Sequence, residues 1–250
     1  MKRFALILLA CLCACALALA EGYAPADDLS DALLYPYDAE DPDSPGCTYI
    51  YAYPQLEEKD NAAADINQFY RDKEAYDLDY EAPTIAEGWL PTGESVTVTV
   101  SYQTVCNNGT FFSVLFCRES VSETVGEHRV WSADTFVCSD ASALAINLPM
   151  LLGTLAPREK DEWLQDRQVE KAEELVREMV WEQIEDNEQD YPFYDDLAEE
   201  DLELIFFPED DFYLDEAGNP VFYLQPGSAA PDEAGLLTFP IDIEEILDEL

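Results

Sequence analysis

Residues 94–120 read ESVTVTVSYQTVCNNGTFFSVLFCRES. Val96, Val98 and Val100 alternate with small polar residues, which is the pattern of a strand buried on one face. Asn108-Gly109 is a strong signal for a tight hairpin turn, and the residues after it are again rich in Phe, Val and Leu. The stretch therefore predicts two long antiparallel strands.

The same turn predicts where the cysteines of the hairpin lie. A two-residue turn places Cys106 opposite Phe111 and Cys117 opposite Val100, so the two thiols do not meet. Outside the N-terminal apolar segment the cysteines are Cys47, Cys106, Cys117 and Cys138. An even number in a secreted chain predicts two disulfides, with all three connectivities open. Zinc is disfavoured because no Cys-x-x-C pair is present.

Around the hairpin, periodicity predicts further elements. Residues 47–54 read as a strand and 57–76 as an amphipathic helix, and residues 128–139 add a third strand to an antiparallel meander. Residues 148–157 form a short apolar segment before a long helix from Arg158 to Asn187. Further strands are predicted at 202–207 and in a hairpin over 212–224, and a closing helix at 242–250.

The predicted fold class is therefore α+β: an antiparallel meander packed with one N-terminal helix and one long central helix, plus a C-terminal β-hairpin module. One domain is expected over residues 47–250, with a β-rich half at about 47–156 and a second half at about 157–250. Such a length is ample for one hydrophobic core.

The N-terminus has the pattern of a secretory signal. Lys2 and Arg3 precede an apolar run, and Ala18-Leu19-Ala20 fits a signal peptidase site. Cleavage of residues 1–20 predicts a secreted protein without a transmembrane helix; the alternatives are an uncleaved anchor or a lipid anchor at Cys11 or Cys15. Residues 21–46 are acidic and rich in proline, which predicts a disordered linker.

The charge balance restricts the class of partner. The chain has 55 acidic and 12 basic residues, a formal net charge of −43. Nucleic acid and anionic membranes are disfavoured, because phosphate binding needs a basic face. A cationic partner is favoured, since opposite net charges accelerate association.

Catalytic motifs are not apparent. The single histidine, His128, stands at the entry to a predicted strand and is interpreted as a turn or packing residue. No H-E-x-x-H, G-x-S-x-G or phosphate-loop motif is present, so we predict no catalytic residue, metal or cofactor. Most aromatic residues are expected in the core, among them Tyr49, Tyr51, Tyr53, Tyr191, Phe193, Tyr194, Phe212, Tyr213, Phe222 and Tyr223.

The C-terminal motif carries a family resemblance. Its residues are Phe212, Tyr213 and Gly218, then Ala230-Pro231 and Gly235, then Phe239 and Ile241. In this order they resemble the RsiV-like and PdaC-like bacterial extracellular domains. There are departures: Val125-Gly126-Glu127-His128 stands where that family often has Gly-Gly-Ala-His, and Gln225 replaces a loop tyrosine. Only Met1-Lys2-Arg3 precede the apolar run, so we expect no anti-sigma segment. The deacetylase members add a catalytic domain with several histidine ligands, and we expect no such domain because the chain ends at Leu250 without one.

The resemblance implies a function that composition alone does not. RsiV-type members bind lysozyme, a cationic protein, so a secreted non-catalytic binding or sensing domain is the first hypothesis. Its implied binding residues are Phe212, Tyr213, Gly218, Ala230, Pro231 and Gly235. The alternatives are a carboxylate-dependent enzyme acting on cell-wall glycan, which needs two acids in a cleft, and a structural cell-surface protein.

Overall fold

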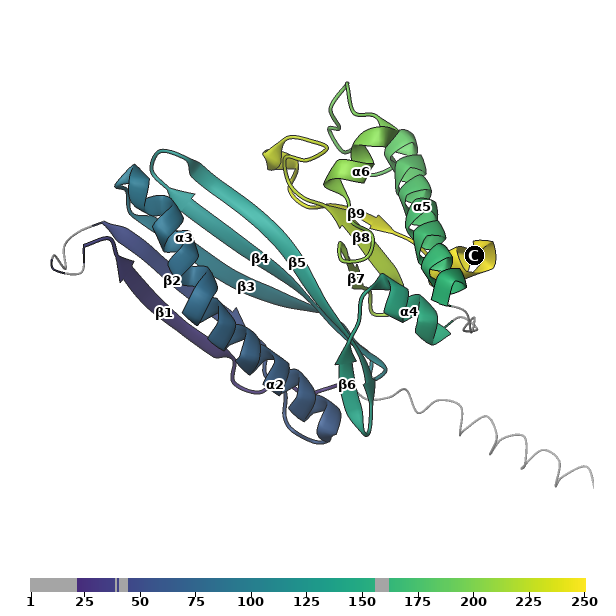
Figure 1. The fold of residues 1–250 in the computed structure, drawn as a ribbon, viewed down its shortest axis with the longest axis horizontal. Coiled ribbons are helices and arrows are strands. Elements are labelled where there is room, and N and C mark those ends of the chain that lie inside the picture. The colour runs from purple at the N-terminus through teal and green to yellow at the C-terminus, as the bar shows by residue number, and fades with distance from the viewer. Residues whose placement is uncertain (1–21, 39, 41–44, 156–161) are drawn as a thin grey trace, which may run out of the picture.

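The computed structural model describes residues 22–38, 40, 45–155 and 162–250 (Figure 1). It has the predicted α+β class, with one six-stranded sheet and a second, three-stranded sheet. The predicted signal segment, including Cys11 and Cys15, lies outside the described residues. No helix within the described ranges is both long and apolar enough to cross a membrane.

The large sheet contains the predicted meander and extends it on both sides. Its strand order is β1-β2-β3-β4-β5-β6, and each neighbouring pair is antiparallel except β2 and β3. The bounds are Leu29–Pro36, Gly46–Tyr53, Val96–Asn107, Phe111–Ser122, Gly126–Ser139 and Ser142–Ala145. β2 and β3 run parallel because a helical crossover separates them. This crossover comprises α2 (Asn61–Tyr76), the π-helix η1 (Asp77–Glu81), α3 (Ala82–Trp89) and η2 (Leu90–Thr92).

Strand β1 corrects the linker prediction for residues 21–46. Residues 29–36 pair along their whole length with β2, from Leu29 opposite Tyr53 to Pro36 opposite Gly46. Leu29, Leu33 and Tyr35 pack against the core of the large sheet. The surrounding acids and prolines masked these apolar positions, and pairing with a preformed strand supplies the hydrogen bonds that offset the ordering entropy.

The β3–β4 hairpin is confirmed, but its predicted register is wrong. Cys106 lies opposite Ser113, and Cys117 lies opposite Ser101. The turn is longer than two residues, because the Asn108 Oδ1 atom accepts hydrogen bonds from the backbone N–H groups of Thr110 and Phe111, at 3.1 and 2.8 Å. A register shift between Thr104 and Cys106 adds a β-bulge in β3.

The predicted disulfides are absent from the described chain, where the four cysteines are free thiols. Each cysteine stands on a different strand, and its cross-strand neighbours are other residue types. Cys47 faces Tyr35 and Val96, Cys117 faces Ser101 and Trp131, Cys106 faces Ser113 and Cys138 faces Ala143. Burial raises the pKa of Cys47, Cys106 and Cys138 to about 11, which keeps these thiols protonated at neutral pH.

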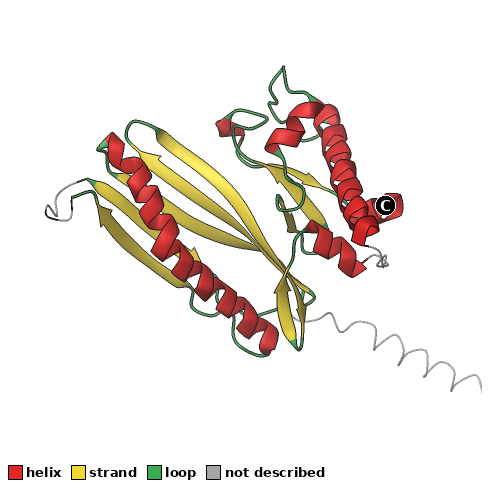
Figure 2. Ribbon diagram, viewed as in Figure 1, coloured by secondary structure: helices red, strands yellow, loops and turns green. Residues whose placement is uncertain are grey.

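In the C-terminal module, helices gather on the side of the small sheet that faces away from the large sheet (Figure 2). The predicted hairpin is β7 and β8, and β9 completes a sheet in the order β7-β8-β9. The bounds are α4 Leu148–Leu155, α5 Glu162–Asp186, η3 Glu199–Asp201, α6 Leu202–Ile205, β7 Phe212–Leu214, β8 Pro220–Leu224, η4 Asp232–Ala234, β9 Leu237–Pro240 and α7 Ile243–Glu249. The strand predicted at 202–207 is wrong: α6 occupies it, because Leu202 and Phe206, four residues apart, are both fully buried on one face.

Two hydrophobic clusters hold these parts together. The first lies between the large sheet and α2 and is rich in aromatic residues, including Tyr49, Tyr53, Tyr70, Phe112 and Phe136. The second fills the C-terminal module and extends to Cys106 of β3. Specific hydrogen bonds join the modules: the Leu214 N–H donates to Ser113 Oγ at 3.2 Å, and the Gln225 amide pairs with the backbone of Trp131 at 2.9 and 2.8 Å.

Asn67 is a buried polar residue on which a stability prediction rests. Its side-chain amide accepts from the Leu56 N–H at 2.7 Å and donates to the Leu56 carbonyl at 2.9 Å. We expect Asn67→Ala to lower the free energy of unfolding by about 2–3 kcal/mol, because both backbone groups would lose a partner in a buried setting. Urea denaturation measures this, with exposed Gln68→Ala in the same helix as the control. Equal losses in the two variants would contradict the role given to Asn67.

Candidate functional site

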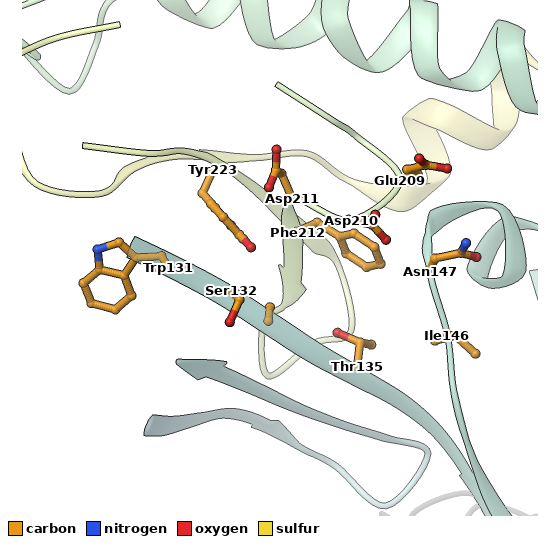
Figure 3. A pocket seen from close by; sticks show the side chains of 11 residues that line it. Trp131, Ser132, Thr135, Ile146, Asn147, Glu209, Asp210, Asp211, Phe212 and Tyr223 are labelled. Carbon is orange, nitrogen blue, oxygen red and sulfur yellow. The ribbon is translucent and has the colours of Figure 1, made fainter. Parts of the chain in front are cut away.

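A cavity of about 230 Å³ lies between strand β5 and the C-terminal module. Figure 3 shows Trp131, Ser132 and Thr135 along β5, with Asp211, Phe212 and Tyr223 across from them. The complete lining is Trp131, Ser132, Ala133, Thr135, Ile146, Asn147, Glu209, Asp210, Asp211, Phe212 and Tyr223. The cavity is therefore assembled from segments of both modules.

Backbone hydrogen bonds hold the acidic segment in place. The N–H groups of Asp210 and Asp211 donate to the Phe207 carbonyl at 3.0 and 2.8 Å, which closes a tight turn. The Asp211 carboxylate accepts from the Phe207 N–H at 2.8 Å. The carbonyls of Asp211 and Glu209 accept from Tyr223 and Leu148 at 3.0 and 3.1 Å. The acids thus stand on a fixed turn between α6 and β7.

The electrostatics of the cavity are acidic. In the described chain, the charged residues that line it are Glu209, Asp210 and Asp211. Burial raises the pKa of Asp211 to about 6, the Phe207 N–H works against this rise, and the charge of Asp210 adds to it. Aromatic rings of Trp131, Phe212 and Tyr223 form much of the remaining wall. Carboxylates beside aromatic faces form a suitable environment for an ammonium or guanidinium group.

Asp211 predicts a pH dependence of stability. Its pKa in the folded protein, about 6, exceeds its ordinary value of 3.8. The stability that this difference contributes is fully present below about pH 4 and is lost as the pH rises through 6. We therefore expect Asp211→Asn to match the wild type below pH 4 and to be more stable by roughly 2 kcal/mol above pH 6.

Denaturant titrations across this pH range test the expectation. Asp195→Asn removes the same charge from an exposed residue outside the cavity lining and so measures the general effect of lowering the net charge. A constant stability difference between Asp211→Asn and the wild type from pH 3 to pH 8 would contradict the assignment.

The binding residues implied by the C-terminal motif do not lie together in the structure. Phe212 lines the cavity and is 3% exposed, whereas Ala230 is buried elsewhere in the core at 1%. Gly218 is buried with φ 94°, where an added Cβ would lie 3.3 Å from Phe111. Tyr213, Pro231 and Gly235 are half-buried. The motif thus mainly builds the small sheet and its loop, and only Phe212 among these residues reaches the cavity.

Sequence reasoning missed the acidic turn. The segment FFPEDDFYL over 206–214 places three acids between aromatic pairs, which is a local signal for a charged turn on an apolar scaffold. Among 55 acidic residues this run did not stand out. His128 lies exposed on β5, opposite Ser120 and outside the cavity lining. Among the described residues, no group of three or more His, Cys, Asp or Glu side chains is placed to hold a metal ion.

Comparison with known families identifies the C-terminal part. Residues 164–244 match the family described as Protein of unknown function (DUF3298). We refer to these matched residues as the DUF3298 domain. The DUF3298 domain begins within α5, ends within α7, and supplies the acidic turn, Phe212 and Tyr223 to the cavity. The β5 wall of the cavity lies outside the DUF3298 domain.

Two solved structures of DUF3298 proteins are similar to the chain. The protein from Bacteroides fragilis NCTC 9343 is 12% identical, with a TM-score of 0.45, and the alignment covers 90% of this chain and 93% of that one. The protein from Pseudomonas aeruginosa PAO1 is 11% identical, with a TM-score of 0.49, and the alignment covers 92% and 95%. None of the curated proteins matches the chain in sequence.

Proposed function

We propose that this protein is a secreted binding module for a cationic protein, and that the cavity between β5 and the DUF3298 domain receives a basic side chain of the partner. The observation that carries this proposal is the acidic turn, whose Glu209, Asp210 and Asp211 share one cavity with three aromatic rings. A guest lysine or arginine would pair with the carboxylates and lie against the rings.

Long-range charge supports the same partner class. A net charge of −43 attracts cations over the whole surface and accelerates encounter. It does not by itself select a partner, since any cation is attracted. The cavity would add selectivity, because a charge that enters it leaves water and needs a matched counter-charge.

Exposed apolar residues that precede the acidic turn in the sequence complete the proposed surface. Leu204 is 76% exposed and Phe207 is 53% exposed. Phe207 is part of the acidic turn, because its backbone N–H binds the Asp211 carboxylate. Aromatic and aliphatic anchors next to charged groups are common in protein interfaces. The partner is therefore expected to present a basic residue beside an apolar one.

The RsiV-like resemblance suggests lysozyme as the partner to test. Mixing the mature chain with lysozyme should give a complex at low salt that weakens as salt is added. Lysozyme with succinylated lysines serves as the control and should not bind. Absence of a complex at low salt would contradict the proposal. Mass spectrometry of the native N-terminus distinguishes cleavage near Ala20 from lipidation at Cys11 or Cys15.

One observation favours a second candidate, a carboxylate-dependent hydrolase of cell-wall glycan. Asp211 lies in a cavity with a pKa of about 6, which suits a general acid at neutral pH. In that case purified protein would release products from peptidoglycan, and Asp211→Asn would abolish the release. Lack of products with the wild type would leave the binding function as the better account.

A further inference from the structure

A lysine of α2 and an aspartate of β5 face each other on the side of the large sheet that α2 covers. Lys73 Nζ lies 3.8 Å from Asp134 Oδ2. The side chain of Asp134 is 18% exposed and that of Lys73 is 32% exposed. Asp134 Oδ2 itself is shielded from solvent and accepts no hydrogen bond from the described residues. The contact is too long for a hydrogen bond, and so the pair does not have the geometry of an optimised ion pair.

The fold brings these two residues together from distant parts of the chain. Lys73 stands in the last turn of α2, whereas Asp134 stands in the middle of β5. Aromatic residues surround them, and Lys73 Nζ lies 5.6 Å from the ring centroid of Phe116. Tyr70, which is fully buried, contributes a hydroxyl without a hydrogen-bond partner in the described chain. The pair thus lies beside buried aromatic side chains.

Further ionisable groups lie beside this pair. Asp77 follows Lys73 by one helical turn, at the start of the π-helix η1, and is 5% exposed. The Tyr53 hydroxyl donates a hydrogen bond to its carboxylate. Lys73, Asp77 and Ser132 line a common cavity of about 60 Å³ together with the ion pair of Arg118 and Glu81. The cavity has room for one or two water molecules. Single π-turns inside helices are frequent at functional sites.

The environment of Asp134 favours the reaction of its carboxyl group with an amine. Burial raises its pKa, Lys73 opposes the rise, and the charge of Asp77 contributes to it. A protonated carboxyl group can be attacked by an amine, whereas a carboxylate resists attack. Lysine is a competent nucleophile once it loses its proton. Fixing the two groups in contact replaces a bimolecular encounter by an intramolecular reaction.

We propose that Lys73 and Asp134 condense to form an isopeptide bond between α2 and β5. Asp77 accepts a proton from Lys73, directly or through water in the shared cavity. The Nζ electron pair then forms a bond to Cγ of Asp134, Asp77 returns the proton to the hydroxyl oxygen of Asp134, and the bond from Cγ to that oxygen breaks to release water. Nζ then loses a second proton to Asp77, which leaves a neutral amide. One amine and one carboxylic acid give one amide and one water, so no oxidant or reductant is needed.

The bond would be a covalent cross-link in a chain whose described cysteines are free thiols. It would join the helical crossover to the sheet, where the observed contacts are otherwise noncovalent. Tyr53 acts through Asp77 and is a positioning residue.

Peptide mapping of the purified full mature chain tests the proposal. Mass spectrometry should find a branched peptide that joins the Lys73 and Asp134 fragments, with the mass of both fragments less one water. Recovery of the two fragments unlinked and in full yield would overturn the proposal. Because this measurement uses the wild-type protein, it does not depend on whether a variant folds.

Variants then test the assigned roles. Lys73→Arg keeps the positive charge but should abolish the branched peptide. Asp134→Asn should still react, with loss of ammonia, and should give a cross-linked product of the same mass as the wild type. Asp77→Asn should slow the appearance of the link at least tenfold after refolding. A link that survives Lys73→Arg, or that forms at the wild-type rate in Asp77→Asn, would overturn the mechanism.

Discussion

Phe222→Ala is expected to destabilise the protein by about 3–5 kcal/mol. Phe222 is fully buried on β8, the central strand of the small sheet, and lies opposite Phe212 on one side and Phe239 on the other. Its ring meets Phe206 edge-to-face, with centroids 5.9 Å apart. Removing the ring loses this contact and leaves a cavity that closely packed neighbours cannot close. The loss is a large fraction of the about 5–15 kcal/mol that stabilises a typical domain.

Phe207→Ala provides a matched control for this prediction. The residue type is the same and the position is next to Phe206, but the side chain of Phe207 is 53% exposed. Its truncation is expected to change the free energy of unfolding by no more than about 0.5 kcal/mol. Guanidinium denaturation followed by circular dichroism measures both variants. Similar midpoints for the two would show that Phe222 is not the packing centre of the C-terminal module.

Strong local patterns made much of the fold predictable. The alternation of Val96, Val98 and Val100 indicated β3 because those residues face the first core. Leu202 and Phe206 were interpreted as part of a strand, since a short apolar run does not distinguish strand from helix. The β1 strand was missed because its stability comes from pairing with β2, a contact that its own composition does not reveal. The predicted fold class was still correct, because each error concerned one edge strand or one short segment.

The candidate site was harder to predict because it depends on tertiary contacts. Trp131 and Tyr223 line the same cavity although they are 92 positions apart in the sequence. Gln225 stands where the RsiV-like pattern has a tyrosine, and it has a structural role here. Its amide pairs with both backbone polar groups of Trp131. This pairing places β5 against the DUF3298 domain and forms the cavity wall. The disulfide prediction was wrong for the same reason, because an even number of cysteines does not reveal which strands become neighbours.

Neutralising the acidic turn is expected to reduce affinity for lysozyme at least about 100-fold, since truncating buried charge pairs in interfaces costs about 2–5 kcal/mol or more. The variant is Glu209→Gln, Asp210→Asn and Asp211→Asn together. Unfolding would not explain such a loss, because Asp211→Asn is expected to stabilise the protein at neutral pH. Calorimetric titration at physiological ionic strength measures the affinity.

A second triple variant separates local recognition from general attraction. Glu182, Asp186 and Glu245 line a larger groove of about 480 Å³ between α5 and α7. Changing them to Gln, Asn and Gln removes the same number of charges, so both variants have the same net charge. If the acidic turn is the binding site, this control should lose only a fewfold in affinity, because well-solvated charges contribute mainly to long-range attraction and to the association rate. Equal losses in both variants would mean that lysozyme responds to total charge alone, and the cavity would then have no part in recognition.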